Sequence, residues 1–89
     1  MKQVVTIFTK PDCPESQALK DFLARDEVPY LEVDITENGE KKRQLVSATG
    51  KNIIPAVTIE QEKLIGKKKQ QIFHGFTTNK KQIDNTLKH

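Results

Sequence analysis

The stretch VVTIFTKPDCPES, residues 4–16, decides the fold. Its first part, VVTIF at 4–8, is apolar and rich in β-branched residues, which is typical of a central, fully buried strand. The following KPDCP predicts a turn, because two prolines and an aspartate break the strand. Pro14 suits the first turn of a helix, and the next residues place apolar side chains on one helical face, at Ala18, Leu19, Phe22 and Leu23. The only cysteine, Cys13, is therefore predicted at the start of a helix.

Strand and helix signals alternate along the rest of the chain. They predict, in order, a strand in VPYLEVDI (28–35), a helix in ENGEKKRQLVSATG (37–50), a strand in IIPAVTIE (53–60), a turn in KLIGKKKQ (63–70), a strand in QIFHGF (71–76) and a helix in TTNKKQIDNTLKH (77–89). Thr77 or Thr78 is a candidate cap for the last helix. Helical crossovers favour parallel pairing, and the short link between the last two strands favours an antiparallel hairpin. The pattern indicates an α/β fold, β-α-β-α-β-β-α, with a four-stranded mixed sheet.

Length and composition indicate one domain over residues 1–89. The net charge of +3 comes from basic runs at 41–43, 67–69 and 80–81, with acidic residues scattered among them, and it indicates a solvated surface. Aromatic residues do not interleave these runs, so nucleic-acid binding is not expected. The absence of a secretory segment and of a long apolar run predicts a cytoplasmic protein with no membrane attachment, in which thiols stay reduced.

Cys13 has two interpretations. A thiolate at the start of a helix is stabilised by backbone N–H groups and by the helix dipole, and the charge of Lys10 adds to this effect. Asp12 and Glu15 oppose it, but as exposed carboxylates they would be screened by solvent. We therefore expect a lowered pKa for Cys13 and a reactive thiol; the alternative is a small, inert, buried side chain.

The segments KPDCPES, VPYLEVDI, IIPAV and HGF, in this order and before a last helix, resemble the glutaredoxin family over nearly the whole chain. The resemblance implies a thioredoxin fold and thiol–disulfide oxidoreductase activity. It implies that Cys13 is the nucleophile and that Pro55 is a cis proline facing it. A cis X–Pro bond is uncommon, so this is a specific prediction.

The same resemblance implies a binding site for glutathione. Lys10 and Lys42 would meet its carboxylates, the backbone of Ile54 would pair with its cysteinyl part, and N–H groups of Phe76 and Thr77 would hold its γ-glutamyl carboxylate. The chain departs from the family in three places, of which one is the segment 61–70, longer and more basic than a tight hairpin needs. The aspartate expected before the last helix is missing, and Glu15 stands where the family often has an aromatic residue or glycine. Another low-molecular-weight thiol, or a protein partner, could therefore take the place of glutathione.

Ser16 stands where a second, resolving cysteine would complete a Cys-Pro-x-Cys pair, and it is either native or an engineered replacement. Without that cysteine only a monothiol mechanism is open, acting on protein mixed disulfides with a small thiol as reductant, and the Ser16 hydroxyl could donate a hydrogen bond to the thiolate. We expect a monomer with no metal, since His74 has no second ligand type near it in sequence. Two alternatives stay open: a non-catalytic thioredoxin-fold module that binds a partner, and a glutathione-dependent iron–sulfur cluster carrier, which Pro14 disfavours.

Overall fold

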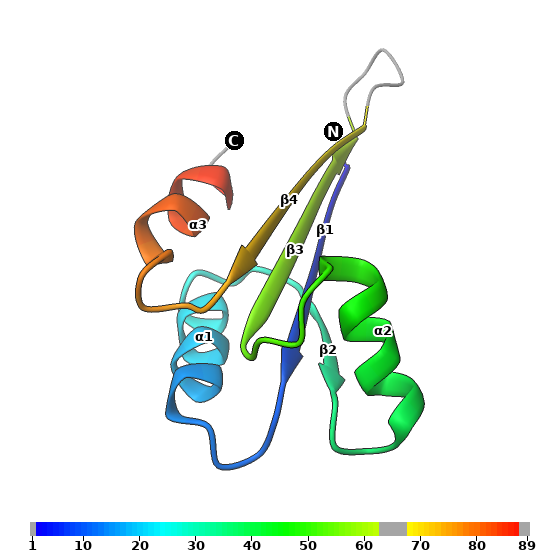
Figure 1. The fold of residues 1–89 in the computed structure, drawn as a ribbon. Coiled ribbons are helices and arrows are strands. Elements are labelled where there is room, and N and C mark those ends of the chain that lie inside the picture. The colour runs from blue at the N-terminus through cyan, green and yellow to red at the C-terminus, as the bar shows by residue number, and fades with distance from the viewer. Residues whose placement is uncertain (1, 63–67, 88–89) are drawn as a thin grey trace.

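Strands and helices alternate in the order that the sequence predicts, as the computed structural model shows (Figure 1). The structure describes residues 2–62 and 68–87. The elements are β1 (Lys2–Thr9), α1 (Pro14–Arg25), β2 (Leu31–Asp34), α2 (Gly39–Thr49), β3 (Ala56–Glu62), β4 (Lys68–His74) and α3 (Lys80–Leu87). The sheet has the strand order β2-β1-β3-β4. β1 is parallel to β2 and antiparallel to β3, and β3 is antiparallel to β4, so the predicted mixed sheet is confirmed.

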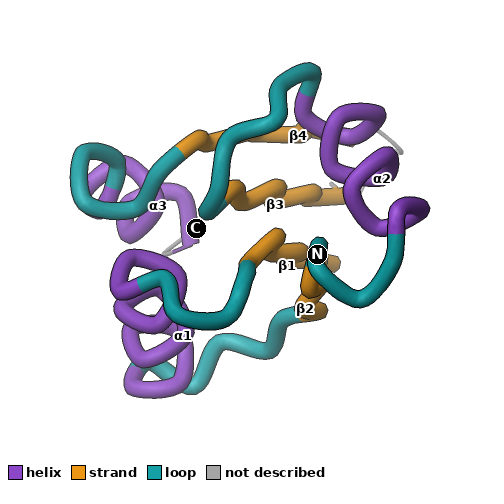
Figure 2. The backbone as a smooth tube through the Cα atoms, turned by 60° about the horizontal axis from the view of Figure 1, so that its bottom comes forward, coloured by secondary structure: helices purple, strands orange, loops and turns teal. Residues whose placement is uncertain are grey.

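The sheet separates two layers of helices. Helices α1 and α3 cover one face and α2 covers the other, which Figure 2 shows with the sheet nearly edge-on. Because side chains alternate along each strand, β1 and β3 contribute to a core on both faces. The larger core lies under α1 and α3 and consists of Val5, Ile7, Leu19, Leu23, Val57, Ile59, Phe76 and Ile83. The smaller core lies under α2 and consists of Phe8, Val33, Leu45 and Ala56.

The start of β2 and the end of β4 differ from the sequence prediction, and the local backbone explains both. Val28 does not begin the second strand, because its N–H donates to the carbonyl of Leu23 and closes α1. β4 ends at His74 rather than at residue 76, because Gly75 adopts a positive φ of 90°. The four predicted apolar positions of α1 are also not equivalent, since Ala18 is exposed on the outer side of the helix.

The last helix begins later than predicted. α3 starts at Lys80, and residues 76–79 form a turn in front of it, so the residue directly before the helix is Asn79 and neither Thr77 nor Thr78 caps it. The Asn79 side chain holds this turn by donating to the carbonyls of His74 and Gly75. Of the turn predicted for residues 63–70, residues 63–67 lie outside the described residues, and residues 68–70 belong to β4, which begins earlier than predicted. Within the described chain, no helix is both long enough and apolar enough to cross a membrane.

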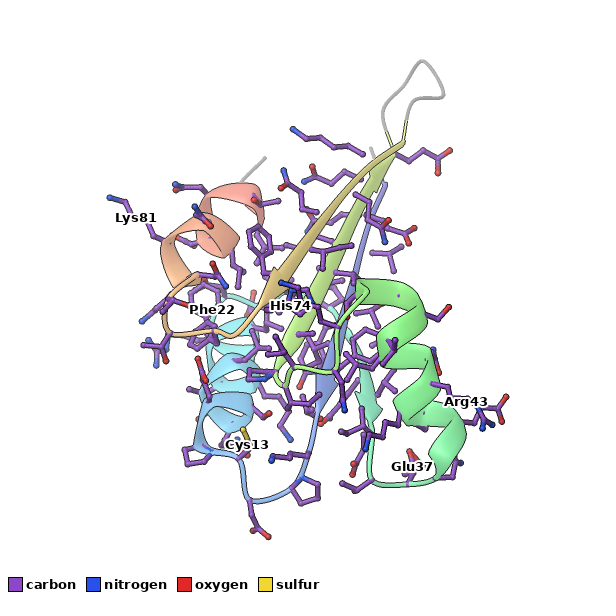
Figure 3. All side chains as sticks on the ribbon, viewed as in Figure 1. Cys13, Phe22, Glu37, Arg43, His74 and Lys81 are labelled. Carbon is purple, nitrogen blue, oxygen red and sulfur yellow. The ribbon has the colours of Figure 1, made fainter. Side chains whose placement is uncertain are left out.

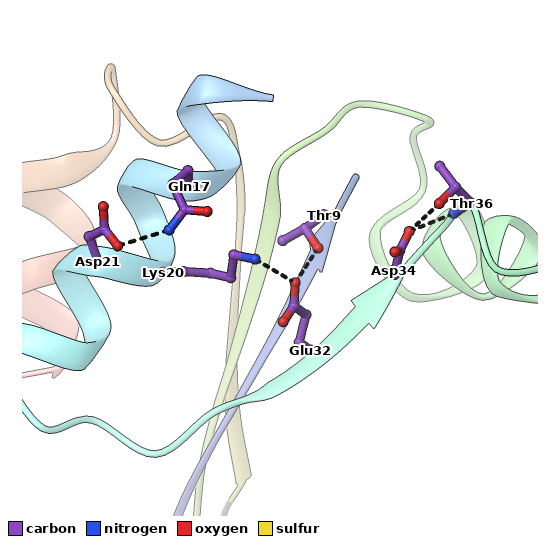
Figure 4. A network of polar contacts seen from close by, with 7 residues as sticks. All are labelled: Thr9, Gln17, Lys20, Asp21, Glu32, Asp34 and Thr36. Atoms are coloured by element: carbon purple, nitrogen blue, oxygen red, sulfur yellow. Dashed lines mark hydrogen bonds and ion pairs between the residues drawn. The ribbon is translucent and has the colours of Figure 1, made fainter. Parts of the chain in front are cut away.

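A polar network fixes the end of β1, just before the loop that carries Cys13 (Figure 4). Thr9 is only 2% exposed, and its hydroxyl donates to Oε2 of Glu32 on β2 at 2.7 Å. The same oxygen lies 3.2 Å from Nζ of Lys20 on α1. A buried hydroxyl needs a partner, and here the partner also joins α1 to β1 and β2. The loop between β1 and α1 therefore has a fixed element at each end.

Candidate functional site

The register of the sheet brings three separate segments to one end of the molecule. Phe8, Ala56 and His74 are neighbours across β1, β3 and β4. β1 and β4 therefore end, and β3 begins, at the same edge of the sheet. Beyond this row lie the loop with Cys13, the Ile54–Pro55 step and the turn after β4. Figure 3 shows Cys13 at this end, where α1 begins.

Cys13 is the N-cap residue of α1, as the sequence predicts. It has extended backbone angles, Pro14 follows as the first helical residue, and the Cys13 carbonyl accepts the first helical hydrogen bond from the N–H of Gln17. Its side chain is partly exposed and is the only described thiol. Partial burial raises the pKa of Cys13. This effect is outweighed by groups that stabilise the thiolate, namely the Ser16 hydroxyl, the N–H groups of Ser16 and Glu15, and the charge of Lys10. The pKa lies below its ordinary value, in the predicted direction.

Ser16 presents a buried hydroxyl group beside this sulfur. The residue is 1% exposed, and its Oγ has no hydrogen-bond partner in the described part of the chain. No acceptor in residues 2–62 and 68–87 meets hydrogen-bond geometry to this hydroxyl, yet its interaction with the Cys13 thiolate, three residues earlier, is the largest of the contributions that lower the pKa of Cys13. Hydrogen bonds to ionised groups are roughly twice as strong as those between neutral groups, so the hydroxyl favours the thiolate over the thiol.

Pro55 lies directly before β3, at the end of the sheet where the loop with Cys13 also lies. The Ile54–Pro55 peptide bond is cis, which confirms the sequence prediction. Pro55 is fully buried, and its carbonyl accepts a hydrogen bond of 2.6 Å from the N–H of Gly75. Ile54 packs against the core under α2. Thus the segment before β3 is tied directly to the turn after β4.

The turn after β4 holds a contact that sequence reasoning missed. Oε1 of Glu15 accepts hydrogen bonds from the N–H groups of Phe76 at 2.8 Å and of Thr77 at 2.7 Å. These two hydrogen bonds, first the one from Thr77 and then the one from Phe76, are the main cause of a lowered pKa of Glu15. The two N–H groups are therefore not free, and Glu15 is not a simply exposed carboxylate. An acidic residue in the first turn of a helix is a recognisable signal, but its partners lie 61 and 62 residues away.

The remaining candidates lie at different distances from this arrangement. Lys10 is exposed in the loop before Cys13. Lys42 is exposed on α2 and lines a shallow hollow made by α2 residues alone. His74 is partly buried, and its Nε2 has no partner among the described residues. In residues 2–62 and 68–87, no group of three or more His, Cys, Asp or Glu side chains is placed to hold a metal ion.

Known proteins match both the sequence and the fold. The family model described as Glutaredoxin matches residues 5–65. Glutaredoxin 3 of Escherichia coli strain K12 is 27% identical over 62 residues, which cover 70% of this chain and 75% of that protein. The thioredoxin-like protein BC3987 superposes with a TM-score of 0.66 and 26% identity, over 88% of this chain and 94% of its own. Trichomonas vaginalis thioredoxin shares the fold, with a TM-score of 0.61 and 24% identity over 92% of this chain and 75% of its own.

Proposed function

Because the chain belongs to the glutaredoxin family, whose members are thiol–disulfide oxidoreductases, we propose that it reduces mixed disulfides by a monothiol mechanism through Cys13. The substrate is a protein joined by a disulfide to a low-molecular-weight thiol. The reductant is a second molecule of such a thiol, glutathione being the co-substrate that the family uses in general. The observation that carries the proposal is a partly exposed thiol whose pKa is lowered at the start of a helix.

In the first step, the Cys13 thiolate attacks the mixed disulfide of the substrate, at the sulfur that comes from the small thiol. The disulfide of the substrate breaks, a new disulfide forms between Cys13 and the small thiol, and the protein leaves as a thiolate that takes a proton from water. The Ser16 hydroxyl and the N–H groups at the start of α1 keep Cys13 ionised for this attack. Lys10 adds a positive charge in the same loop.

In the second step, a free small thiol, ionised, attacks the sulfur of the small thiol held on Cys13. This produces the oxidised small disulfide and releases Cys13 as a thiolate. Overall one disulfide is exchanged for another: the protein sulfur is reduced while the sulfur of the free small thiol is oxidised, so no other reductant is needed. A leaving thiol of low pKa leaves faster, so the same hydrogen bonds that activate Cys13 assist its release.

The surrounding residues take supporting roles in this proposal. Backbone N–H and C=O groups of Ile54 make no hydrogen bond within the described residues, so they can pair with the cysteinyl part of the bound thiol. The buried cis Pro55 holds this segment beside the turn after β4. Lys10 and Lys42 are candidate partners for carboxylates of the small thiol, Lys42 from α2. Phe76 and Thr77 offer N–H groups, subject to the contact with Glu15.

The experiment that tests this proposal is intact-mass analysis after incubation with oxidised glutathione, together with turnover of a glutathionylated peptide. We expect one adduct and measurable turnover for the protein as it stands. Cys13→Ser is the matched control and must lose both, because the sequence contains no other thiol. A Cys13 that forms no adduct and gives no turnover refutes the mechanism and favours a module that binds a partner without catalysis.

A further inference from the structure

Glu15 joins the reactive helix to the turn after β4. It is the second residue of α1, two positions after Cys13, and its backbone N–H contributes to the stabilisation of the thiolate. Its side chain runs the other way, to the N–H groups of Phe76 and Thr77. Both donors converge on the same carboxylate oxygen, Oε1, at 2.8 and 2.7 Å. The turn thus already binds a carboxylate, and the carboxylate belongs to the protein.

The pair of donors is held in place by packing. The Phe76 side chain is 5% exposed in the larger core, with its ring centroid 5.5 Å from that of Phe22 on α1. Gly75, with its φ of 90°, donates its N–H to the carbonyl of Pro55 and so fixes the backbone just before the two donors. Because both flanks are anchored, the two N–H groups cannot turn to meet a second anion elsewhere.

Glu15 forms no salt bridge with a cation of the described residues, whereas Glu32 pairs with Lys20. The Lys80 ammonium lies over the Phe22 ring, 5.9 Å from its centroid. Lys81 points outward into solvent, as Figure 3 shows. A ligand carboxylate that entered this turn would therefore have to displace Glu15 and would then remain close to its negative charge.

Building on the proposed function, we propose that Glu15 is a specificity-determining residue. Its carboxylate occupies the N–H groups of Phe76 and Thr77, so the site disfavours small thiols whose own carboxylate would have to bind to these two N–H groups. The site then prefers mixed disulfides whose small thiol has no carboxylate at that position. Glutathione can react with Cys13, but it binds without these two hydrogen bonds or only after displacing Glu15. The preference is built into α1 itself, since the discriminating residue lies next to the reactive helix start.

The test is a titration of ¹⁵N-labelled protein with S-methylglutathione, which carries both carboxylates of glutathione and cannot react with Cys13. The N–H signals of Phe76 and Thr77 report binding at the turn. We expect Glu15→Ala to lower the Kd at least tenfold, because it frees both donors and removes the competing charge. Glu15→Gln keeps a weaker, neutral acceptor and should give an intermediate Kd. Asp12→Asn removes a carboxylate from the same loop without touching the turn, and should change the Kd less than threefold.

A second measurement separates this inference from the proposed function. One peptide is prepared as a mixed disulfide with glutathione and, separately, with the uncharged thiol 2-mercaptoethanol. Glu15→Ala should improve the kcat/KM for the first substrate relative to the second by about the same factor as the Kd. An unchanged or higher Kd for Glu15→Ala overturns the inference, and a higher one would mean that Glu15 holds the ligand's ammonium group. A lower Kd without turnover of either peptide upholds the inference and refutes the proposed function.

Discussion

Replacing Ser16 with alanine should stabilise the protein and slow its chemistry at the same time. The Ser16 hydroxyl is buried, and its Oγ has no hydrogen-bond partner among the described residues. An unsatisfied buried polar group costs about 1–3 kcal/mol, and alanine is also the better helix former. We therefore expect Ser16→Ala to raise the free energy of unfolding by about 1–2 kcal/mol at pH 6. For a domain of this size, each 1 kcal/mol corresponds to about 4–8 °C in Tm.

The effect on reactivity has the opposite sign. A hydrogen bond to an ionised group contributes about 1.5 kcal/mol, so losing it lowers the thiolate population about tenfold at a pH well below the pKa. The remaining thiolate is more nucleophilic, which recovers about threefold of this loss. Alkylation of Cys13 by iodoacetamide at pH 6 should therefore become about threefold slower in Ser16→Ala. The rate is followed by intact mass, with Cys13→Ser as the unreactive control.

The stability gain should also depend on pH in a defined direction. The pKa of Cys13 is lowered in the folded protein, so its thiolate contributes stability that is fully present above the unfolded pKa and is lost as the pH falls through the folded pKa. Since Ser16 supplies part of this contribution, the advantage of alanine should shrink as the pH rises through that window. In a Cys13→Ala background the advantage should not change with pH.

Urea unfolding under reducing conditions, at pH 6 and at pH 9, measures each of these differences. If Ser16→Ala is less stable than the parent protein by 1 kcal/mol or more at pH 6, the hydroxyl has a structural partner and the reasoning fails. If both unfolding and alkylation are unchanged, Ser16 does not interact with the sulfur.

Three further predictions concern the frame of the site. Gly75→Ala should cost about 1–2 kcal/mol in urea unfolding, because its φ of 90° strains any residue with a Cβ; Gly39→Ala, which meets no atom within 4 Å, should be neutral or stabilising, and equal effects would exclude backbone strain. Glu15→Gln should lose stability above the ordinary glutamate pKa, and this loss should fade as the pH falls through the lowered pKa of Glu15; a loss that does not change with pH in urea unfolding would contradict the role of its charge. Leu23 is fully buried, so Leu23→Ala should lower the free energy of unfolding by about 2–5 kcal/mol. A thermal unfolding curve shifted by less than about 4 °C would place Leu23 outside the core.

Local patterns in the sequence were sufficient for the fold and for the position of the thiol. The β-branched run at 4–8 became β1, and Pro14 with the apolar spacing after it started α1 where predicted, so Cys13 fell at the N-cap. Connection lengths predicted the parallel β1–β2 pair and the antiparallel β3–β4 hairpin, but not that β3 pairs antiparallel with β1. The end of β4 and the start of α3 were wrong by two and three residues, because a positive φ at Gly75 and the side chain of Asn79 set them.

By itself, the sequence determined which residue lies at the helix start and carries the proposed reactivity, because a helix start is a local property of neighbouring residues. Only the tertiary structure decided what surrounds that residue. The register of β1, β3 and β4 brings the turn after β4 to the start of α1, and this lets Glu15 reach the N–H groups of Phe76 and Thr77. A carboxylate that looked like a screened surface charge is therefore a hydrogen-bonded part of the site, since its partners are distant in the chain and adjacent only after folding.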